Sequence, residues 1–276
     1  MKKRKIELVV LSDIHLGTFG CHAKELVNYL SSIKPKILVL NGDIIDIWQF
    51  RKSYFPSTHL KVIQKIINLA SKGTKVYYIT GNHDEMLRKF SDLTMGNISL
   101  VDKVVLELGD KKAWIFHGDV FDASVQHSKW IAKLGGVGYD YLILINRFLN
   151  WLLSKIGKEP YSFSKKIKSS VKKAVKHISD FELTATELGI ENKYDFVICG
   201  HIHEPKIIKK ENKNGSIMYL NSGDWVENLT ALEYNYKRWK LYRYKDTNYT
   251  EDEDLFEMED MISSQLIASL IFTKKK

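Results

Sequence analysis

The chain has 276 residues, 44% apolar and 27% charged, which suits one globular domain or one domain with an inserted segment. Its 42 basic and 33 acidic residues give a formal net charge of +9, which favours anionic partners such as phosphate esters, nucleic acids or an acidic membrane surface. No stretch reaches the roughly 20 apolar residues that a membrane-spanning helix needs, so we do not expect an integral membrane protein.

The N-terminus and the cysteine content favour a cytoplasmic location. The first apolar run is interrupted by Glu7 and ends at Asp13, so it is too short for a secretory signal peptide. The two cysteines, Cys21 and Cys199, form no CxxC motif, which is typical of a reduced interior. We therefore expect a cytoplasmic protein.

Apolar runs rich in β-branched residues alternate with helical patterns in the first half of the chain. Four runs are typical of buried strands: 6–12, 36–42, 75–81 and 112–118. Segments at about 22–33 and 58–72 have helical spacing. This strand–helix–strand order predicts a mostly parallel sheet covered by helices.

From about residue 123 to 190 the strand pattern stops. Residues 139–157 are apolar nearly all round and predict a helix, and residues 155–176 hold eight lysines and one glutamate, a local net charge of +7. We interpret 123–190 as a helical cap inserted into a core formed by 1–122 and 191–248.

Strand-like runs return after the insert. They are "YDFVICG", "PKIIKK", "SIMYLNSG", "LTALEY" and "RWKLYRY", with "KNGS" at 213–216 as a hairpin turn. This half of the chain predicts a second, more antiparallel sheet. Residues 249–276 form an acidic and then apolar tail, which we expect to be a docked amphipathic helix or a poorly ordered end.

Side chains that bind metals follow five of the predicted strands. They are Asp13, His15, Asp43, Asn82, His83, Asp84, His117, His201 and His203. Sites in open α/β sheets form outside the carboxyl ends of the strands. Each motif alone could be only a turn or a helix cap, but five such strand ends together predict a metal site.

The spacing of two of these motifs predicts how their side chains point. In an extended segment, residues two apart face the same way. We therefore expect Asp13 and His15 to face one site, and His201 and His203 to do the same.

The series D-x-H, GD, GNHD, HGD and GHxH, in this order over residues 6 to about 245, resembles the calcineurin-like metallophosphoesterase superfamily. The fold implied by the resemblance is α/β (α+β): two facing mixed β-sheets flanked by helices in a four-layer sandwich, here with a helical cap insert.

The resemblance also implies two divalent metal ions. The ligands of the first ion would be Asp13, His15, Asp43 and His203. The ligands of the second would be Asp43, Asn82, His117 and His201, with Asp43 bridging. A set of nitrogen and oxygen ligands without thiolate suits manganese, iron or zinc, and we expect Mn²⁺.

Two further roles follow from the resemblance. His83 would be catalytic, stabilising charge at phosphorus or protonating the leaving group, with Asp84 orienting it; the alternative is a hydrogen bond from His83 to a metal ligand. Asn82 and His83 would also contact the substrate. Asp46 and Asp119 are expected to support ligands or turns rather than to bind metal.

The stretches "SDIHLG", "NGDIIDIWQF" and "HGDVFD" resemble the UDP-2,3-diacylglucosamine hydrolase group, including the aromatic residue Trp48. The implied reaction splits the pyrophosphate of UDP-2,3-diacylglucosamine into UMP and 2,3-diacylglucosamine 1-phosphate for lipid A biosynthesis, by attack of metal-activated water on phosphorus. Such an enzyme would work in the cytoplasm or as a peripheral protein on the cytoplasmic face of the inner membrane. The apolar helix and lysines of the insert fit an acylated, anionic sugar nucleotide.

One departure keeps alternatives open. Known members of that group read "GNRD" where this chain reads "GNHD", and an imidazole cannot grip a phosphate bidentately as arginine does. A sister branch acting on a soluble nucleotide pyrophosphate or phosphodiester is the alternative. A non-catalytic scaffold is expected less, because every ligand position is filled. No motif indicates nucleic-acid binding, and the sequence leaves the oligomeric state open.

Overall fold

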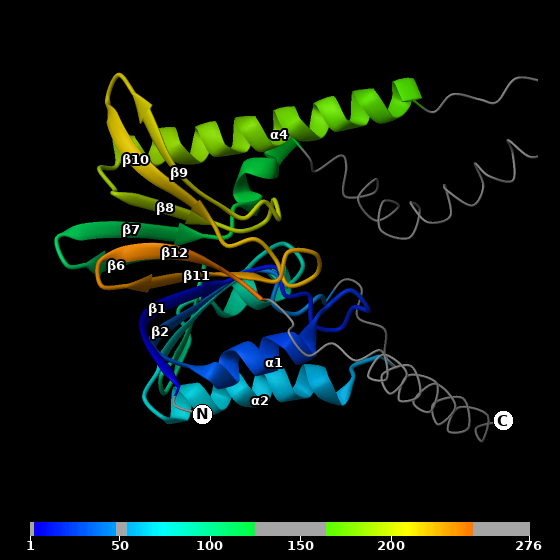
Figure 1. The fold of residues 1–276 in the computed structure, drawn as a ribbon, viewed down its shortest axis with the longest axis vertical. Coiled ribbons are helices and arrows are strands. Elements are labelled where there is room, and N and C mark those ends of the chain that lie inside the picture. The colour runs from blue at the N-terminus through cyan, green and yellow to red at the C-terminus, as the bar shows by residue number, and fades with distance from the viewer. Residues whose placement is uncertain (1–2, 48–53, 125–163, 245–276) are drawn as a thin grey trace, which may run out of the picture. The chain divides into compact units, whose positions relative to one another are not determined.

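The computed structural model describes residues 3–47, 54–124 and 164–244 (Figure 1). The chain forms two compact units, Met1–Asp119 with Ala185–Lys276, and Val120–Thr184. In the predicted cap, the described residues form the 3-10 helix η2 (Asp119–Ser124) and the α-helix α4 (Ser164–Glu191). Three predicted features lie outside the described residues: the helix at 139–157, Trp48 and the tail at 249–276. The boundaries of the cap at 123 and 190 stay a prediction.

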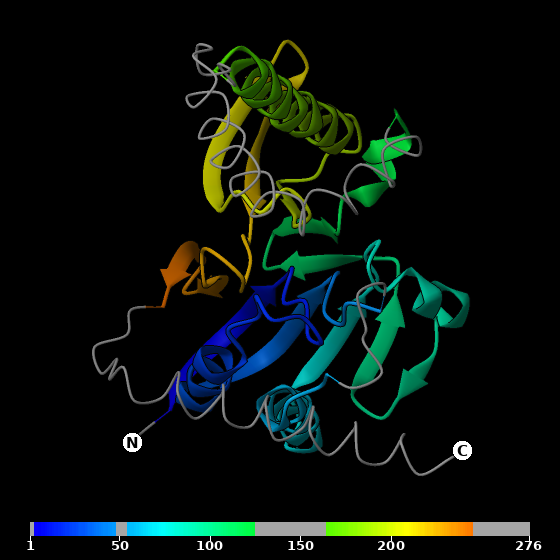
Figure 2. The same ribbon diagram turned by 90° about the vertical axis from the view of Figure 1, so that its right-hand side faces the viewer.

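A seven-stranded sheet has the strand order β12-β11-β1-β2-β3-β5-β4. Its strands are β1 (Arg4–Leu11), β2 (Ile33–Asn41), β3 (Lys75–Ile79), β4 (Thr94–Met95), β5 (Ile98–Val101), β11 (Thr230–Asn235) and β12 (Arg238–Arg243). The strands β1, β2, β3 and β5 run parallel, while β4, β11 and β12 pair antiparallel with their neighbours. Figure 2 shows these strands side by side, with the helices against one face.

A five-stranded sheet has the order β6-β7-β8-β10-β9. Its strands are β6 (Lys103–Leu108), β7 (Lys111–Phe116), β8 (Phe196–Cys199), β9 (Lys206–Asn212) and β10 (Gly215–Asn221). Strand β8 is parallel to both β7 and β10. Asn212 pairs with Gly215 in the β9–β10 hairpin, which confirms the predicted turn.

The prediction that the second half of the chain forms its own sheet was wrong for two strands. Strands β11 and β12 join the seven-stranded sheet, where Val9 of β1 lies opposite Glu233 of β11. In addition, β7 lies in the second sheet and not with β1, β2 and β3. Strand partners are chosen by tertiary packing, which the local pattern of apolar residues does not encode.

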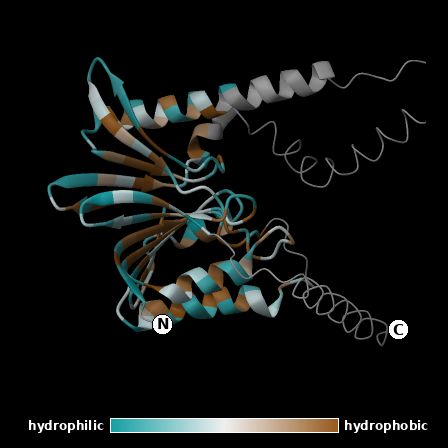
Figure 3. Ribbon diagram, viewed as in Figure 1, coloured by the Kyte–Doolittle hydropathy of each residue, from teal (hydrophilic) through white to brown (hydrophobic). Residues whose placement is uncertain are grey.

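Alternating apolar residues on β1 place the sheet between two hydrophobic layers. Leu8 and Val10 belong to a buried cluster with residues of the other sheet, such as Ile115. Val9 and Leu11 point to the opposite face, into a second cluster with Leu26 of α1 (Ala23–Ser32) and residues of α2 (Ser57–Ser71). Figure 3 shows this apolar character on the strands of both sheets. The predicted fold of two facing mixed sheets flanked by helices is confirmed.

The last turns of α4 cover the outer face of the five-stranded sheet. A Cβ atom at Gly189 would come within 2.4 Å of the Cδ1 atom of Ile217 on β10, so the helix and the strand are in close contact. Within the described residues, no helix is both long and apolar enough to cross a membrane.

His59 on α2 links the stability of this core to pH. The side chain is 3% exposed, and its Nδ1 accepts a hydrogen bond from the backbone N–H of Gly17 at 2.9 Å. Burial lowers the pKa of His59 to about 4, against about 6.5 in an unfolded chain. Between about pH 6.5 and about pH 4 the unfolded state binds a proton that the buried imidazole of His59 does not bind. The free energy of unfolding therefore falls as the pH drops through this range. Above about pH 6.5 this contribution to stability is constant.

We predict that His59→Asn, whose Oδ1 can accept the same hydrogen bond, loses less stability than the wild type between about pH 7 and about pH 5. Urea unfolding at the two pH values measures this difference. An equal loss in both proteins would show that His59 does not carry the effect.

Candidate metal centre

The predicted ligands gather where five strands end. Backbone hydrogen bonds tie the loops that follow these strands. The N–H of Asp13 donates to the carbonyl of Gly42 at 3.0 Å, and the N–H of His15 donates to the carbonyl of Asp43 at 2.9 Å. In the other sheet, the N–H of Gly200 donates to the carbonyl of His117 at 3.0 Å.

Three groups of side chains have ligand atoms within 4.8 Å of one another. They are Asp13, His15 and His203; His15, Asp43 and His83; and Asp43, His117 and His201. The structure therefore brings together all six predicted histidine and aspartate ligands, with His83 beside them. The first group holds three of the four ligands implied for one ion and lacks Asp43, and the third holds three of the four implied for the other and lacks Asn82. The second group shares His15 with the first and Asp43 with the third.

Unsatisfied buried atoms test whether these residues fit metal ions. The Nδ1–H of His117 donates to the backbone carbonyl of Asn41 at 2.8 Å, which turns its buried Nε2 towards the carboxylate of Asp43, 3.3 Å away. The Nδ1 of His15 lies 3.2 Å from Asp46, and its Nε2 is buried without a hydrogen-bond partner. The buried Oδ1 of Asn82 also has none. Buried acceptors of this kind, with the tautomer fixed by a hydrogen bond on the far side of the ring, are what metal ligation requires.

The charges of the side chains also fit a site for cations. Burial raises the pKa of Asp13, but the charge and hydrogen bond of His203 and the charge of His117 together outweigh burial and hold the pKa at about 2. Burial also raises the pKa of Asp43, but His117, His15 and His83 together outweigh burial and hold this pKa well below the usual range. Burial lowers the pKa values of His117 and His203, but Asp43 and Asp13 raise them to about 10 and about 9. Protons on His117 and His203 thus balance the two carboxylates, and binding of metal ions at these residues would release protons.

Left-handed backbone is concentrated at this centre. Among the described residues, ten residues other than glycine have positive φ, and half of them are predicted ligands: Asp13 (51°), His15 (55°), Asp43 (54°), His201 (68°) and His203 (51°). The prediction that the D-x-H and H-x-H motifs are extended was therefore wrong. Asp13 and His15 reach one group through left-handed backbone, whereas His201 and His203 belong to different groups. Such strain persists where surrounding bonds enforce it, typically at functional sites.

His83 is held by Asp46 and not by Asp84. The Nδ1 of His83 lies 2.8 Å from Asp46, and its Nε2 lies 4.0 Å from Asp43. The carboxylate of Asp84 instead accepts hydrogen bonds from Ile44 N–H, Tyr78 O–H and Gly81 N–H. The expected pairing of His83 with Asp84 is thus replaced by Asp46, and Asp84 braces the loops. Asp119 pairs with Arg88 at 2.8 Å, outside the three ligand groups.

Two asparagines and one aspartate support the ligands and were not predicted. The amide of Asn41 donates to the carbonyl of Phe116 at 3.1 Å, and that of Asn221 donates to the carbonyl of Gly200 at 2.8 Å. Asp224 lies 4.0 Å from the Nδ1 of His203. Both asparagines end a strand in the pattern Leu-Asn, where a buried strand would otherwise be apolar. That pattern was a signal for buried polar support.

Gly81 gives room to Asp43. A Cβ atom at position 81 would lie 2.2 Å from the Oδ1 of Asp43 and 2.6 Å from its backbone nitrogen. We predict that Gly81→Ala displaces this carboxylate and weakens metal binding about 10–100-fold. The matched control is Gly73→Ala, which meets no atom within 4 Å but has φ of +93°. It should cost about 1 kcal/mol of stability and keep its metal.

Metal analysis by mass spectrometry and urea unfolding of both variants measure these effects. Full metal content in Gly81→Ala would contradict the central position of Asp43.

Comparison with known proteins places this centre in a family. The model of calcineurin-like phosphoesterases matches residues 6–205. The UDP-2,3-diacylglucosamine hydrolase of Blochmanniella pennsylvanica is 26% identical over 242 residues, covering 84% of this chain and 93% of the relative. The protein of that name from Aliivibrio fischeri is 25% identical over 244 residues, covering 86% and 98%.

Among solved structures, the phosphoesterase Yfce from E. coli aligns with a TM-score of 0.42 and 13% identity, covering 86% of this chain and 99% of that one. The family match extends over most of the chain and includes every predicted ligand. The chain belongs to the calcineurin-like phosphoesterase family and is a metal-dependent hydrolase.

Proposed function

We propose that the chain splits the pyrophosphate of UDP-2,3-diacylglucosamine into UMP and 2,3-diacylglucosamine 1-phosphate, a step of lipid A biosynthesis. The observation that carries the reaction type is the gathering of six predicted ligands in three overlapping groups, two of which share Asp43. The substrate is supported by the names of relatives that align with 84–86% of the chain.

The proposed cofactor is a pair of Mn²⁺ ions, with iron or zinc as alternatives. One ion would be held by Asp13, His15, Asp43 and His203, and the other by Asp43, Asn82, His117 and His201. When bound, two such ions polarise the phosphoryl group and make water a nucleophile at neutral pH.

His83 is the proposed proton donor. Burial lowers its pKa, but the hydrogen bond to Asp46 and the charge of Asp43 outweigh burial and raise it. A protonated ring with Nδ1 on Asp46 presents its Nε2–H towards the ligand groups. It can then stabilise negative charge at phosphorus or protonate the leaving group. Asp46 is a positioning residue, since it acts through His83, and Asn82 is proposed to contact the substrate.

The proposed partner is an anionic, acylated sugar nucleotide, which a net charge of +9 favours. Because the acyl chains keep such a substrate in a lipid layer, we propose that the enzyme works in the cytoplasm, at the surface of the inner membrane.

A second candidate rests on His83 itself. An imidazole in place of arginine gives one hydrogen bond to phosphate instead of a bidentate pair. This favours a sister activity, hydrolysis of a soluble nucleotide pyrophosphate or phosphodiester at the same centre.

We predict that His83→Ala lowers kcat about 10²–10⁴-fold while metal content stays unchanged, because His83 acts on the reacting phosphate. The control is His22→Ala, an exposed histidine beside Glu25, which should keep both activity and metal. Loss of metal from His83→Ala would instead make His83 a ligand.

The substrate is tested by turnover of UDP-2,3-diacylglucosamine in H₂¹⁸O with Mn²⁺, followed by mass spectrometry. We expect the label in UMP and none in 2,3-diacylglucosamine 1-phosphate, because water attacks the phosphorus of the uridylyl group. Asp43→Ala is the inactive control. Rapid hydrolysis of a soluble phosphodiester without turnover of the lipid substrate would favour the sister activity.

A further inference from the structure

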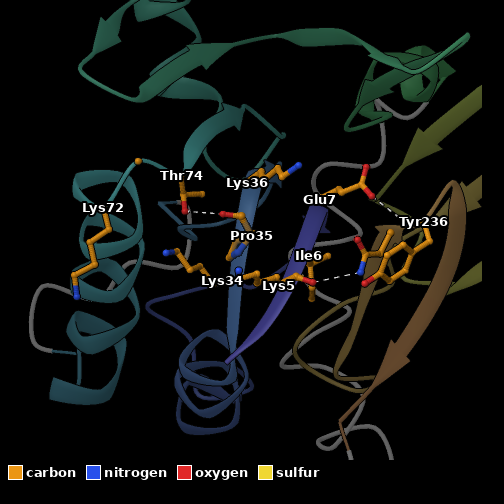
Figure 4. A pocket seen from close by; sticks show the side chains of 11 residues that line it. Lys5, Ile6, Glu7, Lys34, Pro35, Lys36, Lys72, Thr74 and Tyr236 are labelled. Atoms are coloured by element: carbon orange, nitrogen blue, oxygen red, sulfur yellow. Dashed lines mark hydrogen bonds between the residues drawn. The ribbon is translucent and has the colours of Figure 1, made fainter. Parts of the chain in front are cut away.

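A pocket lies at the end of the seven-stranded sheet opposite to the ligand groups. It has a volume of about 400 Å³ and is formed by the starts of β1 and β2, the turn before β3 and the β11–β12 turn (Figure 4). The ligand groups follow the carboxyl ends of these parallel strands. The length of β1 from Lys5 to Leu11, roughly 20 Å, separates the pocket from them. It is therefore a site of its own.

The lining of this pocket is strongly basic. Lys5, Lys34, Lys36 and Lys72 line it, and within the described residues none of the four makes an ion pair. The one acidic residue of the lining, Glu7, accepts the backbone N–H of Tyr236 at 3.0 Å and so holds the neighbouring turn. Four lysines and one glutamate leave a net charge of +3, so the pocket suits an anion.

Lys72 also acts on Lys65 of α2. Burial lowers the pKa of Lys65, and the charges of Lys3 and Lys72 lower it further. Like charges therefore repel one another at this edge of the pocket. A multiply charged anion would relieve this repulsion.

An aromatic residue stands at the pocket in a strained turn. Tyr236 and Lys237 connect β11 to β12 with φ of 51° and 61°, a geometry for which hairpins favour Asn-Gly. Tyr236 is 85% exposed, so packing does not explain why a bulky side chain occupies this position. Because the strained backbone of Tyr236 is not offset by burial of its side chain, we infer that the ring has a functional role.

We propose that this pocket binds a nucleotide, with its phosphates on the four lysines and its base stacked on Tyr236. Lysine binds phosphate as a point charge, and every base offers a face for stacking on an aromatic ring. The volume lies in the range of small-ligand sites, about 300–1,000 Å³. This site is independent of the proposed hydrolysis.

The test is calorimetric titration of the full, Mn²⁺-loaded chain with α,β-methylene-ADP, which resists hydrolysis between its phosphates. Lys34→Gln/Lys36→Gln should weaken one binding event at least about tenfold. Tyr236→Gly removes the ring and suits the turn, and it should weaken the same event about 5–100-fold. The matched control is Lys111→Gln/Lys112→Gln, which removes two exposed lysines from β7 and should leave this event unchanged.

Two simpler probes separate the parts of the ligand. Methylenediphosphonate should lose affinity in the lysine variant alone, and adenosine in the tyrosine variant alone. Absence of any binding event that depends on Lys34 and Lys36, equal weakening in the control, or no effect of Tyr236→Gly would overturn the proposal. A different result would also overturn it: the pocket variants lose binding to phosphatidylglycerol vesicles while their nucleotide binding is unchanged. The pocket would then contact a membrane.

Discussion

The architecture of the site depends on one buried carboxylate, that of Asp43. It is 2% exposed, and burying a charge is costly unless opposite charges and hydrogen bonds surround it. The backbone carbonyl of Asp43 accepts the N–H groups of Ile14 and His15, and its Oδ1 accepts the N–H of His83. The ring of His117 approaches from the other sheet. Three loops and two sheets are therefore positioned relative to one residue, through its backbone carbonyl and its carboxylate.

The close approach of the two sheets is what allows this convergence. Gly42 has φ of +81°, and a Cβ atom there would lie 2.2 Å from the Nδ1 of His117. Any larger residue at this position would push the sheets apart at the point where their ligands meet. The amide of Asn41 at the end of β2 bonds to the carbonyl of Phe116 in the other sheet, and that of Asn221 bonds to the carbonyl of Gly200 within the five-stranded sheet, so these buried amides are satisfied by backbone.

Much of this could be predicted from the sequence, for physical reasons that differ between elements. Strands β1, β2, β3 and β7 are buried, so their β-branched runs are unambiguous, and metal ligands stand out because buried strand ends do not otherwise need imidazole. The sheet membership of β11 could not be predicted, since its residues suit either sheet. The left-handed backbone of Asp13 and His15 was hidden because neither is glycine, and the pairing of His83 with Asp46 depends on how two loops fold together.

We propose that two metal ions share Asp43. Electron paramagnetic resonance of the chain loaded with Mn²⁺ tests this sharing, because ions bridged by one carboxylate are magnetically coupled. We predict the spectrum of a coupled pair in the wild type and its loss in Asp43→Ala. A wild-type spectrum of isolated ions only, at full metal occupancy, would show that Asp43 does not bridge two ions.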